Sequence, residues 1–84
     1  MTTRDLGLIA ALYCLNFQET RVFSENVRRI EFEFSEDTIS LVKSYYDGSL
    51  LLPALQYFQS LKTVKNRINY IKDTADENLR HIYR

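Results

Sequence analysis

Residues 19–34, ETRVFSENVRRIEFEF, decide the fold class, because here the apolar side chains recur at every second position. Ile30, Phe32 and Phe34 alternate with charged residues, which is the pattern of a strand with one buried face and one solvated face. The flanking segments show helical spacing instead. A strand region set between helices predicts an α+β fold.

The same stretch predicts an antiparallel β-hairpin, with Val22 on the first strand. A three-residue loop centred on Asn26 would place Val22 opposite Ile30 on the buried face. A two-residue loop at Glu25-Asn26 would place Arg21 there instead. The sequence therefore favours the longer loop.

A first helix is predicted before the hairpin. Its apolar residues recur at helical spacing: Leu8, Ile9, Leu12 and Leu15. Thr2 or Thr3 would cap this helix, and Asp5 would lie in its first turn, where the helix dipole favours an anion. The helix should end near Asn16.

A second helix is predicted after Ser35, which precedes two acidic residues as an N-cap does. We expect it to turn four residues inward: Ile39, Val42, Tyr45 and Tyr46. Gly48 should end it in the left-handed conformation, and Pro53 suits the first turn of the next helix. Residues 50–52, three leucines, should fill the gap between the two helices.

The segment from Pro53 to about Ile82 predicts one long helix. Its apolar residues follow alternating three- and four-residue steps, with one polar member: Leu61, Val64, Ile68, Ile71, Ala75, Asn78 and Ile82. About 30 residues span roughly 45 Å, whereas a domain of this size has a radius of gyration near 12 Å by the usual scaling. We therefore predict one domain over residues 1–70 and a helical extension over residues 71–84.

The bulk composition is that of a small intracellular protein. The 84 residues carry 11 basic and 11 acidic side chains, but residues 1–42 have a net charge of −3 and residues 43–84 of +3. One cysteine excludes an internal disulfide and fits a reducing compartment, so we expect a cytoplasmic location. The apolar run over residues 6–15 is about half the roughly 20 residues that a membrane span needs, so we expect no membrane association.

The sequence offers little material for catalysis. His81 lies near the C-terminus, where it suits the end of a helix, and Cys14 lies between apolar neighbours, as a buried thiol does. Glu31 and Glu33 could imitate a carboxylate pair, but Arg29 shares their face, which favours a solvated mixed-charge surface. The two glycines form no phosphate-binding loop. We expect no enzyme activity, catalytic residue, cofactor, metal site or small-molecule substrate.

Nucleic-acid contact is the alternative function. The residues that could contact a nucleic acid are the hairpin arginines and the last-helix cations: Arg21, Arg28, Arg29, Lys62, Lys65, Arg67 and Lys72. Acidic residues beside the hairpin offset the arginines. Binding that falls steeply with salt would support this alternative.

The last helix instead favours self-association. The predicted oligomer interface is the far part of the apolar seam: Val64, Ile68, Ile71, Ala75, Asn78 and Ile82. Lys65 and Lys72 flank this seam on one side and Arg67 on the other, so parallel pairing would bring cations together. An antiparallel dimer, or docking on the acidic first half of a second copy or of another protein, relieves this repulsion. Alternatively, the helix folds across its own sheet.

Four motifs occur here in the order of a known family. They are Thr3–Asp5 leading into Leu8–Leu12, then Arg28–Phe34, then Tyr45–Gly48, and finally Pro53 followed by Tyr57, Leu61, Lys62 and Ile68. Over residues 3–70 the chain resembles a family of short uncharacterised domains of phages, bacteria and archaea, known as a domain of unknown function. Leu52 departs from the polar residue that the family often has before the proline. The resemblance implies the fold and a mobile-element origin, and no activity.

These inferences combine into an α+β domain with the order helix, β-hairpin, helix, long helix. We predict a non-enzymatic binding or assembly module of phage or mobile-element origin that self-associates through its C-terminal helix. A small nucleic-acid-binding accessory protein is the alternative, and an inhibitor of a host protein is a third reading.

Overall fold

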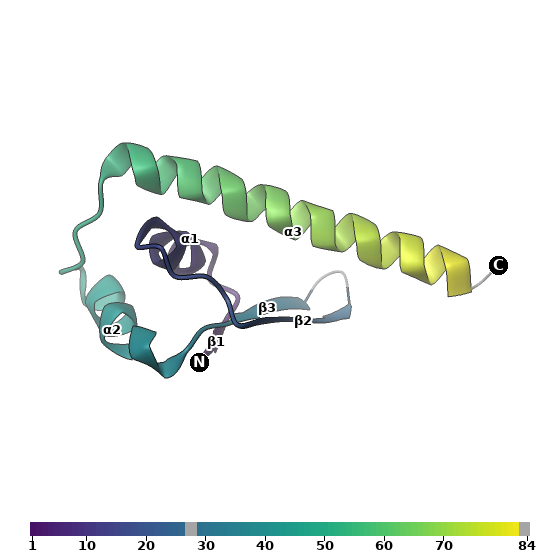
Figure 1. Ribbon diagram of the computed structural model, residues 1–84, viewed down its shortest axis with the longest axis horizontal. Coiled ribbons are helices and arrows are strands. Elements are labelled where there is room, and N and C mark those ends of the chain that lie inside the picture. Colours follow the sequence, from purple (N-terminus) through teal and green to yellow (C-terminus); the bar gives the residue numbers. More distant parts are fainter. Residues whose placement is uncertain (27–28, 83–84) are drawn as a thin grey trace.

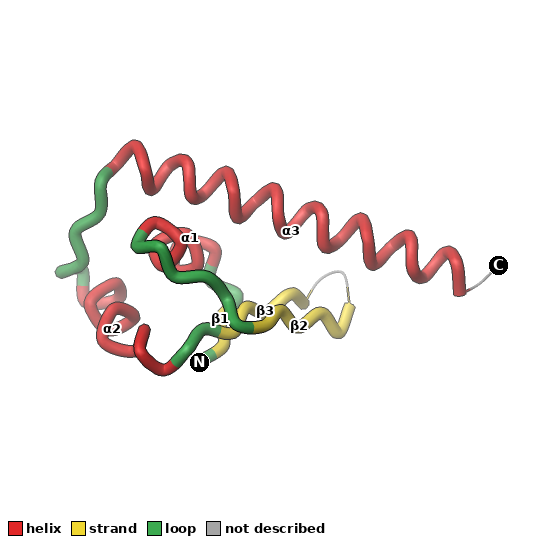
Figure 2. Tube along the Cα trace, viewed as in Figure 1, coloured by secondary structure: helices red, strands yellow, loops and turns green. Residues whose placement is uncertain are grey.

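The computed structural model describes the backbone of residues 1–26 and 29–82, and the side chains of residues 1–24 and 29–73. Its elements in chain order are β1 (Thr2–Thr3), α1 (Leu6–Cys14), β2 (Arg21–Asn26), β3 (Arg29–Glu33), the 3-10 turn η1 (Glu36–Thr38), α2 (Ile39–Asp47) and α3 (Ala54–Ile82). Figure 1 shows their arrangement, and Figure 2 distinguishes helices, strands and loops. The predicted α+β class and element order are confirmed, with one additional strand at the N-terminus.

The sheet is antiparallel with the strand order β1-β3-β2. Val22 lies opposite Phe32 and Ser24 opposite Ile30, so the predicted pairing of Val22 with Ile30 is wrong by two residues. A register irregularity lies between Ser24 and Asn26, and β2 continues to Asn26, the residue predicted to be the centre of the loop. Because side chains alternate with a period of two, this shift leaves Val22 on the predicted core face.

The N-terminal residues form a strand rather than a helix cap. Thr2 and Thr3 pair with β3, which corrects the prediction that one of them caps α1. Asp5 is itself the N-cap, and its side chain accepts hydrogen bonds from the backbone N–H groups of Gly7 and Leu8, at 3.0 and 3.3 Å. The acidic residue therefore stands one position before the helix and satisfies the backbone N–H groups of its second and third residues.

Helix α1 occupies the centre of the molecule. The buried apolar residues come from α1, β3, the residue after β3, and α3: Leu8, Ile9, Ala10, Ala11, Leu12, Ile30, Phe32, Phe34 and Val64. In Figure 1 α1 lies between α3 on one side and the sheet and α2 on the other. A helix with neighbours on several sides needs apolar residues around its circumference, which explains the uninterrupted run Leu8–Leu12.

The start of the second helical segment differs from the prediction. The segment begins with η1, and Thr38 is fully buried at the junction with α2. Because a 3-10 turn has three residues per turn, the following face is rotated relative to one continuous α-helix. Ile39 and Tyr46 are therefore 46% and 62% exposed, against the prediction, whereas Val42 and Tyr45 pack on the core as expected.

The corner between α2 and α3 follows the prediction for its glycine. Gly48 has φ 83° and caps the C-terminus of α2 in the left-handed region. Leu50 and Leu52 are half-buried, but Leu51 is 89% exposed and does not fill the gap. Pro53 precedes α3, and its carbonyl accepts a hydrogen bond from the N–H of Tyr57 at 2.9 Å.

Helix α3 is 29 residues long and runs along the longest dimension of the molecule, 50 Å. As predicted, it projects beyond the core, and in Figure 1 it continues past the described ends of β2 and β3. Its inward residues pack on the core: Tyr57, Leu61, Val64, Ile68 and Ile71. The apolar seam therefore covers the chain's own core as far as Ile71, and α3 passes through residue 70 without a break.

Candidate functional site

The polar side chains that were singled out for chemistry and that the structure describes do not converge. Among the described residues no group of three or more His, Cys, Asp and Glu side chains could hold a metal ion. Cys14 is half-buried at the end of α1. Glu31 and Glu33 lie on the face of the sheet turned away from the core, opposite Phe23 and Arg21 on β2. The side chain of His81 lies outside the described residues.

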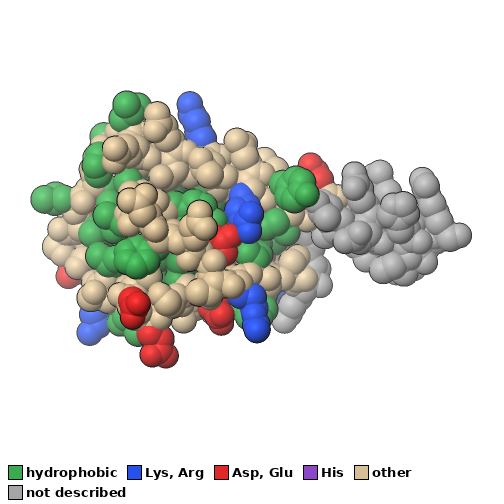
Figure 3. All heavy atoms as spheres, viewed as in Figure 1, with side chains coloured by type: hydrophobic (Ala, Val, Ile, Leu, Met, Phe, Trp, Pro, Cys, Tyr) green, Lys and Arg blue, Asp and Glu red, His purple; other side chains and the backbone are tan. Residues whose placement is uncertain are grey.

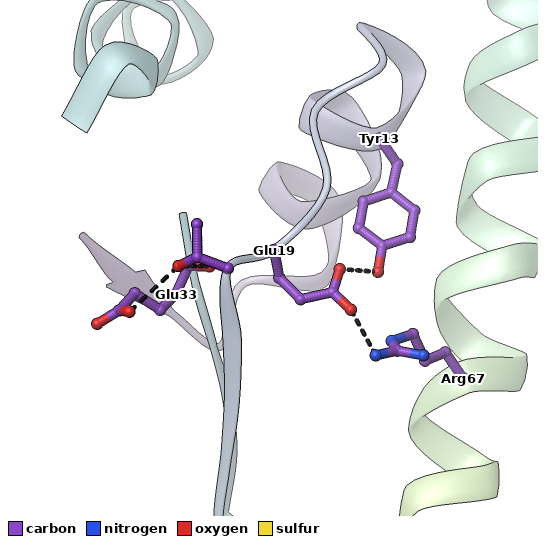
Figure 4. Close-up of polar contacts among 5 residues, drawn as sticks. Tyr13, Glu19, Glu33 and Arg67 are labelled. Atoms are coloured by element: carbon purple, nitrogen blue, oxygen red, sulfur yellow. Dashed lines mark hydrogen bonds and ion pairs between the residues drawn. The ribbon is translucent and has the colours of Figure 1, made fainter. Parts of the chain in front are cut away.

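A polar bridge joins the connection between α1 and β2 to α3 (Figure 4). The hydroxyl of Tyr13 donates to the carboxylate of Glu19, and Arg67 Nη2 lies 2.5 Å from Glu19 Oε1. The Glu19 side chain is 10% exposed. Burial, and then the hydrogen bond to Glu19, raise the pKa of Tyr13 well above its usual range. Arg67 therefore has a partner within the chain.

Three tyrosines gather at the N-terminal end of α1. Tyr57 donates to the carbonyl of Gly7 at 3.2 Å, and Tyr46 donates to Asp5 Oδ2 at 2.9 Å. Burial, and then a hydrogen bond with Tyr57, raise the pKa of Tyr45 to about 12. Because α2 supplies two of these tyrosines and α3 the third, the cluster fixes both helices to the start of α1. It has the character of a structural joint.

The outward face of the sheet carries the hairpin arginines. The guanidinium of Arg21 lies 5.2 Å from the centre of the Phe23 ring, and Arg29 helps to line a hollow of about 450 Å³ together with Phe23 and Glu31. Among the described residues, two arginines and two glutamates share this face, so their charges balance. Arg28 lies outside the described residues.

The predicted nucleic-acid contacts are divided between two surfaces. Arg21 and Arg29 lie on the outward sheet face, whereas Lys62, Lys65 and Lys72 are exposed on α3. The core lies between the sheet face and α3, and the visible lysines and arginines in Figure 3 are scattered over the surface. The structure therefore does not bring these residues together into one basic surface.

Exposed apolar side chains mark a different part of α3. Leu55 and Phe58 are 72% and 65% exposed, and Lys62 and Lys65 continue the same side of the helix at three- and four-residue steps. We call these four residues the apolar–basic stripe. In Figure 3 hydrophobic side chains protrude at the end of the molecule where α3 begins. The stripe was not predicted from the sequence, although its residues have the same three- and four-residue spacing as the inward seam.

A second exposed surface lies on η1 and α2. We call it the acidic α2 face, and it comprises Glu36, Asp37, Ile39, Lys43, Tyr46 and Asp47, all exposed. Three acidic side chains and one lysine give it a negative charge, and Ile39 and Tyr46 give it apolar surface. Hydrogen bonds from Ser49 lower the pKa of Asp47. Figure 3 shows acidic side chains over this part of the molecule.

The predicted oligomer interface is only partly available to a partner. Val64 is fully buried on the side of α3 that packs against α1. It is therefore a core residue, which corrects its assignment to an interface. Ile68 and Ile71 are half-buried against the same core. The side chains of Ala75, Asn78 and Ile82 lie outside the described residues.

No helix in the described part of the chain is long and apolar enough to cross a membrane. No family model, curated protein or solved structure matches this chain, so the family resemblance stays a prediction.

Proposed function

We propose that the protein is a small non-enzymatic assembly module that self-associates through the apolar–basic stripe of α3. The observation that carries this proposal is the exposure of Leu55 and Phe58, at 72% and 65%, together with that of Leu51 in the corner before α3, at 89%. Fully burying one such side chain stabilises a complex by about 1.5–3 kcal/mol. Clustered exposed apolar residues are typical of interaction sites, whereas single ones need no explanation.

The stripe lies on a rigid support, which lowers the entropic cost of association. Val64, six residues after Phe58 on the same helix, is fully buried, and the hydroxyl of Tyr57, beside Phe58, donates a hydrogen bond to the carbonyl of Gly7 in α1. The backbone that carries the stripe is therefore ordered before a partner arrives. Preorganisation of this kind leaves more of the contact energy for affinity.

Charge limits how two copies can meet. Among the described residues, Lys62 and Lys65 have no ion-pair partner. Two stripes placed against each other would bring these cations together, unless an antiparallel arrangement set each lysine pair against the other copy's apolar residues. The stripe therefore suits an acidic surface with apolar residues of its own.

The nucleic-acid alternative has less support. Arg67 is paired with Glu19, and the other described residues of the predicted nucleic-acid contact lie on two surfaces rather than one. A contact through the lysines of α3 alone would use Lys62, Lys65 and Lys72. The proposed phage or mobile-element origin rests on the family resemblance alone.

Sedimentation velocity over a range of concentrations tests the proposed function. The parent protein should exceed the 10.0 kDa mass of one chain at high micromolar concentration. Replacing Leu55 and Phe58 together by Ser should return it to the monomer with an unchanged far-UV circular dichroism spectrum. The matched control replaces Gln56 and Thr63 by Ser, because both are exposed on α3 outside the stripe. A parent protein that stays monomeric at these concentrations contradicts the proposal.

A further inference from the structure

Two exposed surfaces of this chain complement each other in charge and in apolar content. The apolar–basic stripe presents two large apolar residues and two lysines, and the acidic α2 face presents Ile39, Tyr46 and an excess of acidic groups. We infer that the acidic α2 face of one copy is the docking site for the apolar–basic stripe of another. This inference rests on the proposed function and names the partner surface.

The composition of each surface supports this pairing over pairing of like surfaces. Stripe against stripe leaves the lysines without an acidic partner even in the antiparallel arrangement, and the α2 face against itself would bring Glu36 and Asp37 of two copies together. Stripe against α2 face pairs opposite charges around a shared apolar contact of Leu55 and Phe58 with Ile39. An interface with apolar residues at its centre and paired charges at its rim is the common arrangement between proteins.

The inferred contact joins two different surfaces, so each copy offers one stripe and one α2 face. Helix α1 lies between α2 and α3 and contacts both (Figure 1). Two copies that cover both of each other's surfaces form a closed dimer, whereas copies that use two different neighbours form a ring or an open chain. In each of these forms the contact differs from the antiparallel pairing of two C-terminal helices that the sequence favours.

Two variants that each remove one surface test this arrangement. The stripe variant carries Leu55→Ser and Phe58→Ser, and the α2 variant carries Glu36→Lys and Asp37→Lys. Each variant alone should be monomeric, since each lacks one of the two surfaces that every contact needs. An equimolar mixture should form a complex of twice the 10.0 kDa chain mass and grow no further, because only one intact contact remains.

The alternatives give different results in the same experiment. If the α2 variant alone assembles like the parent protein, the docking site is not the α2 face, although the proposed function still holds. If the parent protein is monomeric, both the inference and the proposed function are wrong. If both variants are monomeric but their mixture gives no complex, the two surfaces do not bind each other and the inference is wrong.

Further variants keep the test independent of folding. The two lysines of the α2 variant would place positive charge at the start of η1, where the helix dipole disfavours it. A second α2 variant, Ile39→Ser, therefore keeps Glu36 and Asp37 and has the same expected loss of assembly. Glu31→Lys, on the outward sheet face, is the control for charge reversal and should assemble like the parent protein. Circular dichroism and thermal melting establish that each variant is folded. High salt should weaken assembly of the parent protein without abolishing it, because the apolar contact is not screened.

Discussion

At the residue scale, Gly48 has a conformational role that can be measured. A Cβ at Gly48 would meet no heavy atom within 4 Å, so Gly48→Ala causes no clash and acts only through backbone strain at φ 83°. We expect the free energy of unfolding to fall by about 1 kcal/mol, because a left-handed conformation is strained for alanine. Urea unfolding measures this, with the exposed Lys43→Ala as the control expected to stay within about 0.5 kcal/mol. Equal stability of the Gly48 variant and the parent protein would refute this role.

Gly7 is constrained in a different way, by its neighbour Tyr45. A Cβ at Gly7 would overlap the Tyr45 hydroxyl, whereas helix propensity alone favours alanine over glycine by about 1 kcal/mol. We therefore expect Gly7→Ala to change the free energy of unfolding more favourably in a Tyr45→Phe background, which lacks the hydroxyl, than in the parent protein. Coupling energies between contacting residues are about 0.5–3 kcal/mol. A double-mutant cycle by urea unfolding measures this one, and additive effects would show that no contact exists.

The tyrosine cluster predicts a loss of stability at alkaline pH. The pKa of Tyr45 rises from 10.0 to about 12 in the folded protein, so the neutral hydroxyl is favoured by folding. Its contribution is complete below pH 10.0 and is lost as pH rises from there toward about 12. Urea unfolding across this range should show a shallower decline for Tyr45→Phe than for the parent protein. Identical pH profiles would exclude this contribution of Tyr45.

At the element scale, the bridge from Glu19 to Arg67 fixes the connection before β2 against α3. Removing Arg67 leaves a carboxylate whose side chain is only 10% exposed without its cation. We expect Arg67→Ala to destabilise the protein by about 1–2 kcal/mol, below the cost of breaking a fully buried pair because Arg67 is itself 45% exposed. Lys65→Ala, on the same helix without an ion-pair partner among the described residues, should stay within about 0.5 kcal/mol. Equal effects of the two substitutions would show that the bridge contributes nothing.

The elements also show which features the sequence alone could predict. Periodicity of two placed Ile30 and Phe32 correctly, because a strand's buried face depends only on alternation. The register was not predictable, because it is shifted by an irregularity between Ser24 and Asn26, and alternation of side chains does not show where such a shift occurs. The orientation of Ile39 depends on whether the first turn is 3-10 or α, and these two turns differ only in whether each hydrogen bond spans three or four residues. Strand β1 has only two residues, too few to show a period.

At the scale of the whole molecule, the candidate site was harder to predict than the fold. The spacing of α3 indicated correctly that its apolar residues need to be covered, but the covering surface is the chain's own core as far as Ile71. Which of two adjacent stripes faces inward depends on how α3 is rotated against α1, and rotation is a tertiary property that spacing does not contain. Leu55 and Phe58 lie outside the contact between α3 and α1, and their spacing alone does not indicate this.

Truncation separates the two surfaces of α3 that could carry self-association. A chain ending after Asp73 keeps every core residue from Leu8 to Ile71, and it also keeps the apolar–basic stripe and the acidic α2 face. We expect this shortened chain to fold and to assemble with the concentration dependence of the full-length protein, because no residue of the inferred contact is removed. Sedimentation velocity and circular dichroism of both chains measure this. The full-length variant Ile82→Lys is the matched control, and it should also assemble normally. If the full-length protein assembles but the shortened chain and the Ile82→Lys variant are folded and monomeric, association depends on the predicted far seam of Ala75, Asn78 and Ile82, and the stripe is not the contact.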